Sequence, residues 1–127
     1  MPPRTVACVY DGVLILESLK VGTVLDGIPL TVTKVSRVAV GGTSADQPAV
    51  WSLLEFTVER GEELADVLAG VLDGPGWYAD FHDEHEIFVI FPGRVFRYRR
   101  GDDAAREEAK EFGRGLAIPE AQLDWTR

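Results

Sequence analysis

The segment 86–91, with the sequence EIFVIF, constrains the fold more than any other part of the chain. Side chains of a β-strand alternate between its two faces. Every residue after Glu86 in this segment is Ile, Phe or Val, so both faces are apolar. A strand of this kind lies inside a sheet and is covered on both sides, by helices or by a partner subunit.

The residues around this strand predict a hairpin. Pro92-Gly93 follows it as a turn dipeptide, and the segment 94–100 then has strand character. The register stays open, because two-residue hairpins prefer turn types other than those that Pro-Gly favours. Acidic residues precede the hairpin and four arginines follow within 94–100, which predicts cross-strand charge pairs worth ~0.2–1 kcal/mol each.

The remaining elements follow from hydrophobic periodicity and from turn residues. Helices are predicted over 62–73 and 103–114, with Asp102 as the cap of the second helix. Asp11-Gly12 is interpreted as a turn, and Leu123 and Trp125 are expected to pack back onto the domain. Strands are predicted over 6–9, 13–19, 30–40 (with a bulge near Lys34), 50–58 and 77–82.

These elements predict one α+β domain spanning residues 1–127. We expect a mainly antiparallel sheet with two helices packed chiefly on one face, ferredoxin-like only by analogy. Helices on one face would leave apolar strand surface on the other, and a homodimer formed through the sheet would cover it.

Charge and cysteine content narrow the functional classes. The chain has 13 Lys and Arg against 21 Asp and Glu, a net charge of −8, which argues against nucleic-acid binding. We find neither a signal peptide nor a run of the ~20 apolar residues that span a bilayer. The single cysteine, Cys8, is read as a small apolar residue and suits a reducing compartment, so we expect a cytoplasmic protein.

Several motifs resemble those of a family of small uncharacterised bacterial proteins. They are WYADF at 77–81, GRVFRYRRGD at 93–102 and IPEAQLDW at 118–125, and the resemblance extends from about Val13 onward. It implies a soluble, stand-alone domain, and it carries no activity or ligand.

The segment 77–100 contains the richest concentration of aromatic and charged side chains in the chain, and this concentration predicts a binding site. We expect a pocket that takes a small ligand or a partner protein, without a cofactor. Its predicted residues are Trp77, Tyr78, His82, Arg97 and Tyr98.

The same stretch raises three other classes of site. Nucleic-acid binding by the basic segment 94–100 with Phe96 and Tyr98 is opposed by the acidic neighbours and by the net charge of −8. A small enzyme could use His82 with Asp80 or Glu55 for acid–base chemistry, since histidine exchanges protons near neutral pH. His82 and His85 lie among carboxylates, but His-x-x-His spacing does not place both on one strand face, so no metal is expected. The sequence contains no Gly-x-Ser-x-Gly, His-Glu-x-x-His or nucleotide fingerprint, and does not decide whether the protein is an enzyme.

Overall fold

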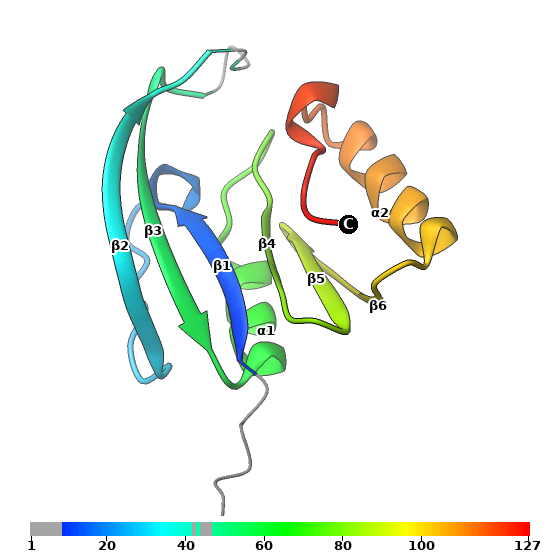
Figure 1. Cartoon of the computed structure of the whole chain (residues 1–127). Coiled ribbons are helices and arrows are strands. Elements are labelled where there is room, and N and C mark those ends of the chain that lie inside the picture. The colour runs from blue at the N-terminus through cyan, green and yellow to red at the C-terminus, as the bar shows by residue number, and fades with distance from the viewer. Residues whose placement is uncertain (1–8, 42, 44–46) are drawn as a thin grey trace, which may run out of the picture.

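Six strands form one antiparallel sheet in the order β2-β3-β1-β4-β5-β6 (Figure 1). The computed structural model describes residues 9–41, 43 and 47–127. The predictions for Cys8 and for most of the 6–9 strand therefore lie outside the described residues. The elements are β1 (Tyr10–Ile15), β2 (Leu30–Ala39), β3 (Val50–Val58), α1 (Gly61–Val71), β4 (Ala79–His82), β5 (Glu86–Phe91), β6 (Arg94–Arg99) and α2 (Asp103–Gly115), with short 3₁₀ turns at Leu16–Ser18 and Glu120–Gln122.

The first strand lies inside the sheet. β1 pairs antiparallel with β3 on one side and with β4 on the other. The β3–α1–β4 connection therefore spans β1, and strands from the two halves of the chain become neighbours across it. This strand order differs from that of the ferredoxin-like arrangement of two βαβ units, so that analogy is not confirmed.

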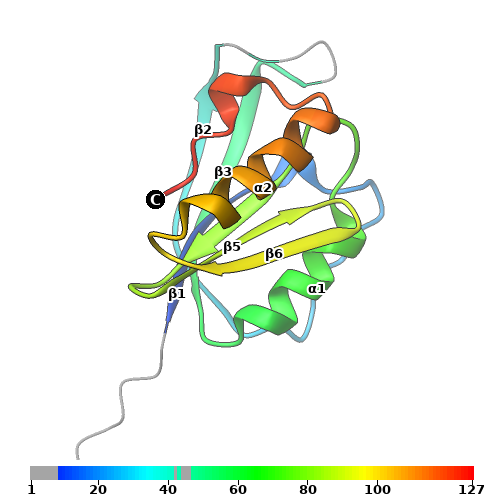
Figure 2. The same cartoon turned by 90° about the vertical axis from the view of Figure 1, so that its right-hand side faces the viewer.

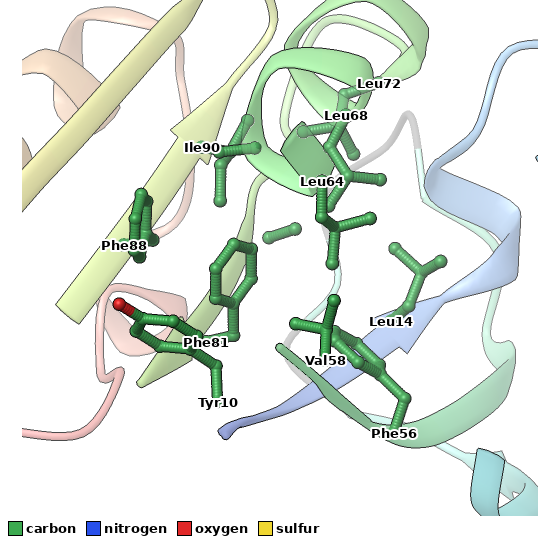
Figure 3. Packing of buried hydrophobic residues seen from close by; sticks show 12 residues of the cluster. Tyr10, Leu14, Phe56, Val58, Leu64, Leu68, Leu72, Phe81, Phe88 and Ile90 are labelled. Atoms are coloured by element: carbon green, nitrogen blue, oxygen red, sulfur yellow. The ribbon is translucent and has the colours of Figure 1, made fainter. Parts of the chain in front are cut away.

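The two helices cover opposite faces of the sheet, so the expectation that both pack on one face is wrong. Phe88 and Ile90 of β5 join the core beneath α1 (Figure 3), whereas Ile87, Val89 and Phe91 join a second core with α2. Figure 2 shows both helices beside the β5–β6 hairpin. The physical reason is the two-faced apolar strand itself, because each face needs its own cover.

Asp11-Gly12 is not a turn, and β1 runs through it. A Cβ atom on Gly12 would lie 2.7 Å from the Phe56 ring and 2.8 Å from Cβ of Phe81. The glycine is therefore required by close packing of two aromatic residues over the strand. The prediction of a turn was therefore wrong, because Asp-Gly marks a site of close packing here and not a chain reversal. β1 begins at Tyr10, three residues earlier than the predicted strand over 13–19.

Other local predictions are confirmed. The β2–β3 register shifts between Val32 and Lys34, as expected for a bulge. Phe91 pairs with Arg94 across the Pro-Gly turn, whose Gly93 has a φ of 76°. The Asp102 side chain accepts a hydrogen bond of 3.0 Å from the Ala105 amide and caps α2. In the described part of the chain, no helix is long and apolar enough to cross a membrane.

Candidate ligand-binding groove

An open groove lies on the sheet face that α2 covers only in part. The helix and the C-terminal segment pack against β5 and β6, and Figure 1 shows them on the side of the sheet away from β2 and β3. The lining of the groove comes largely from β1, β2 and β3. Val13 shows the consequence, because it is 43% exposed although β1 lies inside the sheet. A cavity of about 290 Å³ opens here, and its lining residues are Val13, Ile15, Val38, Val40, Trp51, Leu53, Gly76, Trp77, Tyr78, Asp80, Gln122 and Asp124.

Two tryptophans in contact form most of the aromatic part of this lining, beside Tyr78. The ring centroids of Trp51 and Trp77 lie 5.3 Å apart with an interplanar angle of 59°. The Trp51 indole N–H donates to the Pro48 carbonyl at 2.8 Å, which orients that ring. Because the rings contact each other, no ligand fits between them. The partly exposed Trp51 ring offers an apolar surface beside the aliphatic floor of the sheet, and the buried Trp77 ring supports it from behind.

The C-terminal segment supplies the opposite wall and is fastened by polar contacts. The Tyr78 hydroxyl donates to the Gln122 carbonyl. The Trp125 indole N–H donates to the Tyr98 hydroxyl at 2.7 Å, and the Arg106 guanidinium donates to the Trp125 carbonyl at 2.8 Å. Leu123 and Trp125 are buried, which confirms that the tail packs back onto the domain.

Asp80 lies at the polar end of the cavity, on the side of β4 opposite the α1 core. Among the residues that the structure describes, no hydrogen bond or ion pair engages its carboxylate. Burial is the main cause that raises the pKa of Asp80 from 3.8 to about 6, the Asp124 carboxylate adds to it, and the Arg106 guanidinium opposes it. The side chain therefore changes charge close to neutral pH.

A second cavity of about 230 Å³ adjoins the first and shares Val13 and Asp80 with it; its lining also includes Asp11, Gly12, Thr33, Glu55, Phe56, His82 and Thr126. The strand register explains this grouping. Val13 is paired with Glu55 on one side and Asp80 on the other.

His82 also lines the second cavity, because strand pairing places it beside Asp11. Asp11 is paired with His82 across β1 and β4, two residues along from the Val13 row. The His82 Nδ1 atom is buried and has no hydrogen-bond partner among residues 9–41, 43 and 47–127. The Glu55 carboxylate lies 3.7 Å from the Lys34 ammonium. Over the same ranges, no group of three or more His, Cys, Asp or Glu side chains is placed to hold a metal ion.

The five residues predicted for the site do not all meet. Trp77 and Tyr78 line the first cavity and His82 lines the second. Tyr98 is buried beneath Trp125, and Arg97 lies on the other face of the sheet, because neighbours on a strand point in opposite directions.

Arg97 is engaged in structural contacts on the α1 face. Its guanidinium lies 4.9 Å from the centre of the Phe88 ring and donates to the Glu86 carboxylate at 2.7 and 2.9 Å. It also contacts Glu62 of α1, while the Tyr10 hydroxyl donates to Glu86. The hydrogen bonds from Arg97 and Tyr10 lower the pKa of Glu86, although its partial burial opposes them. The predicted charge pairing across the hairpin is thus confirmed.

Most residues that line the first cavity were absent from the predicted site, and three of them show why. Trp51 comes from β3 and Val13 from β1, and neither shows a local sign of function. Asp124 belongs to the tail, for which only packing was predicted. These side chains meet Asp80 only because β1 lies between β3 and β4 and the tail returns to the sheet.

The fold and the groove define a small α+β domain with an antiparallel sheet and one partly open face. Comparison of the chain with known protein families, with curated proteins and with solved structures found no match. The resemblance of its motifs to a bacterial family therefore stays a prediction, and the function is argued from the groove.

Proposed function

We propose that this domain is a binding module that takes up a small molecule in the groove between β1, β3 and the C-terminal segment. The observation that carries the proposal is the cavity that joins the Trp51–Trp77 surface to the half-buried carboxylate of Asp80. A mostly apolar recess with a few polar groups at one end is the usual form of a small-molecule site.

The size of the cavity sets the size of the ligand. Its volume of about 290 Å³ lies at the lower end of the roughly 300–1,000 Å³ of ligand pockets. A single ring system with a short side chain suits this volume. The exposed Val13 supports the same proposal, since a ligand would remove this side chain from water.

A ligand-observed NMR screen of small aromatic and aliphatic compounds tests the proposal. Val13→Phe fills the floor of the groove without entering the core, because Val13 is 43% exposed. Val50→Phe is the matched control, because Val50 is a strand valine with the same 43% exposure and lies outside both cavities of the groove. We expect compounds that bind the wild-type protein and V50F but not V13F. If every binding compound is insensitive to V13F, the groove is not the site.

One observation favours a second candidate, a small enzyme with acid–base chemistry. His82, Asp80 and Glu55 line the same cavity, and the His82 Nδ1 atom has no described partner there. His82→Ala should then abolish any turnover that a substrate screen finds. A pH–rate profile that this substitution leaves unchanged would eliminate the enzyme hypothesis.

We also propose that the module is a cytoplasmic homodimer. Exposed valines support self-association, since Val32 and Val35 on the edge strand β2 are 51% and 62% exposed. A second copy of the chain is the partner proposed for this surface. The single cysteine of the sequence suits a reducing compartment.

A further inference from the structure

The two adjoining cavities differ in chemistry, and this difference bears on the class of ligand. The first is lined chiefly by aliphatic and tryptophan side chains, and the second gathers Asp11, Glu55 and His82. Asp80 lines both cavities. A molecule in the groove would therefore meet an apolar surface at one end and carboxylates at the other.

We infer that the groove selects a protonated amine with an apolar body, whose ammonium group lies at Asp80 and whose body lies on the Trp51–Trp77 side. The inference rests on the proposed binding function and names its ligand class. A ligand of this kind matches both ends of the groove at once.

The charges around Asp80 favour a cation. Four carboxylates line the two cavities, on Asp11, Glu55, Asp80 and Asp124. Lys34 is held by Glu55, and the Arg106 guanidinium donates to the carbonyls of Trp125 and Thr126. The four carboxylates outnumber these two cations, so an anion would meet a net negative charge here, which disfavours it.

The state of Asp80 gives the cation its advantage over a neutral molecule. A partly desolvated carboxylate without a partner is costly, and a neutral ligand that covered it would remove more water without replacing its hydrogen bonds. An ammonium group replaces that water with charge-assisted N–H···O bonds. The amine is thus the ligand that relieves the cost rather than adding to it.

The apolar end requires a hydrocarbon body. Ile15, Val38 and Leu53 form a floor without a hydrogen-bonding side chain, and the two indole rings lie beside it. Covering this surface is favourable by roughly 25 cal/mol per Å² of apolar area. A small inorganic cation would leave it in water, so the groove fits an amphipathic amine better than a free ion.

Affinity for the amine should rise with pH between about 5 and 7, as the Asp80 carboxyl loses its proton. Other titratable or charged groups lie near Asp80 on the elements around it. They are Tyr78 just before β4, His82 on β4, Asp11 on β1, Glu55 on β3, Arg106 on α2 and Asp124 in the C-terminal segment.

Three probes with one body separate charge from shape: phenethylamine, phenethyl alcohol and 3-phenylpropionate. Each is titrated into the full ¹⁵N-labelled chain at pH 7.5, with the indole N–H signals of Trp51 and Trp77 as the readout. We expect the amine to bind at least tenfold more tightly than the alcohol and the acid to bind most weakly.

Asp80→Asn should reduce amine affinity to that of the alcohol and leave alcohol affinity unchanged, which also shows that the variant is folded. Asp66→Asn, on the exposed side of α1, is the matched control and should change neither. Equal affinities of amine and alcohol, or a preference that survives D80N, would overturn the amine inference while groove binding stands. If none of the probes moves either indole signal, the inference fails, and the V13F-sensitive screen decides separately whether the groove binds anything else.

Discussion

Replacing Asp80 by asparagine should stabilise the protein at alkaline pH and leave its stability unchanged in acid. The folded state raises the pKa of this carboxyl from 3.8 to about 6. The carboxylate is therefore penalised in the folded chain and not in the unfolded one. This penalty is absent below pH ~4, grows as the pH rises through about 6, and is complete above pH ~7.

The magnitude follows from the same pKa difference. At roughly 1.4 kcal/mol per pKa unit, the difference between 3.8 and about 6 gives about 3 kcal/mol as an upper limit. Asp80 is half-buried and borders a cavity, so solvent screening lowers this figure. We expect D80N to raise the free energy of unfolding by about 1–3 kcal/mol at pH 8 and by almost nothing at pH 4.

Urea unfolding from pH 4 to pH 8.5, followed by far-UV circular dichroism, measures this effect. At a typical slope of ~1–3 kcal/mol per M, the midpoint of D80N should move upward by about 0.5–2 M at pH 8. Asp124→Asn should give a smaller gain, because it removes only the repulsion between the Asp124 and Asp80 carboxylates. The gain of the double variant should be smaller than the sum of the two single gains, because both substitutions remove this same repulsion. D66N should stay near the wild type throughout. A D80N effect that is equal at all pH values would refute the reasoning, since only ionisation produces the slope.

Three further changes test the packing and assembly. Gly12→Ala should lower the free energy of unfolding by about 1–3 kcal/mol, because the new Cβ would lie 2.7 Å from the Phe56 ring; an unchanged thermal midpoint would show that the strand can shift. Tyr98→Phe should cost about 1–3 kcal/mol, because the buried Trp125 indole N–H loses its acceptor; denaturant unfolding measures the loss, and a neutral effect would mean that water replaces the hydroxyl. Native mass spectrometry should find the wild-type chain as a dimer and Val35→Lys as a monomer; a wild-type monomer would contradict the homodimer proposal.

Local sequence patterns predicted most elements of the fold. Residues 50–58 and 86–91 have the predicted strand bounds, and Asp102 caps its helix as expected. These features depend on alternation, periodicity and capping, which act over a few residues. Local patterns gave the wrong prediction for Asp11-Gly12. Its glycine is required by close packing against Phe56 and Phe81, which lie far away in the chain.

The predicted site lies in the right region of the chain, but only some of its five residues line the groove. Trp77, Tyr78 and His82 do line the groove, whereas Arg97 and Tyr98 point away from it on opposite faces of β6. Strand alternation could have separated these two residues from each other. It could not have shown which of the two faces stays open.

What the sequence by itself determined is most of the elements, including the two-faced apolar strand β5, because hydrophobic patterning is a local property of the chain. Only the tertiary structure decided that β1 lies between β3 and β4. That insertion places Val13 between Glu55 and Asp80, and the returning tail brings Asp124 beside them. No local pattern encodes these neighbours, because strand order depends on how the whole apolar surface of the chain is buried.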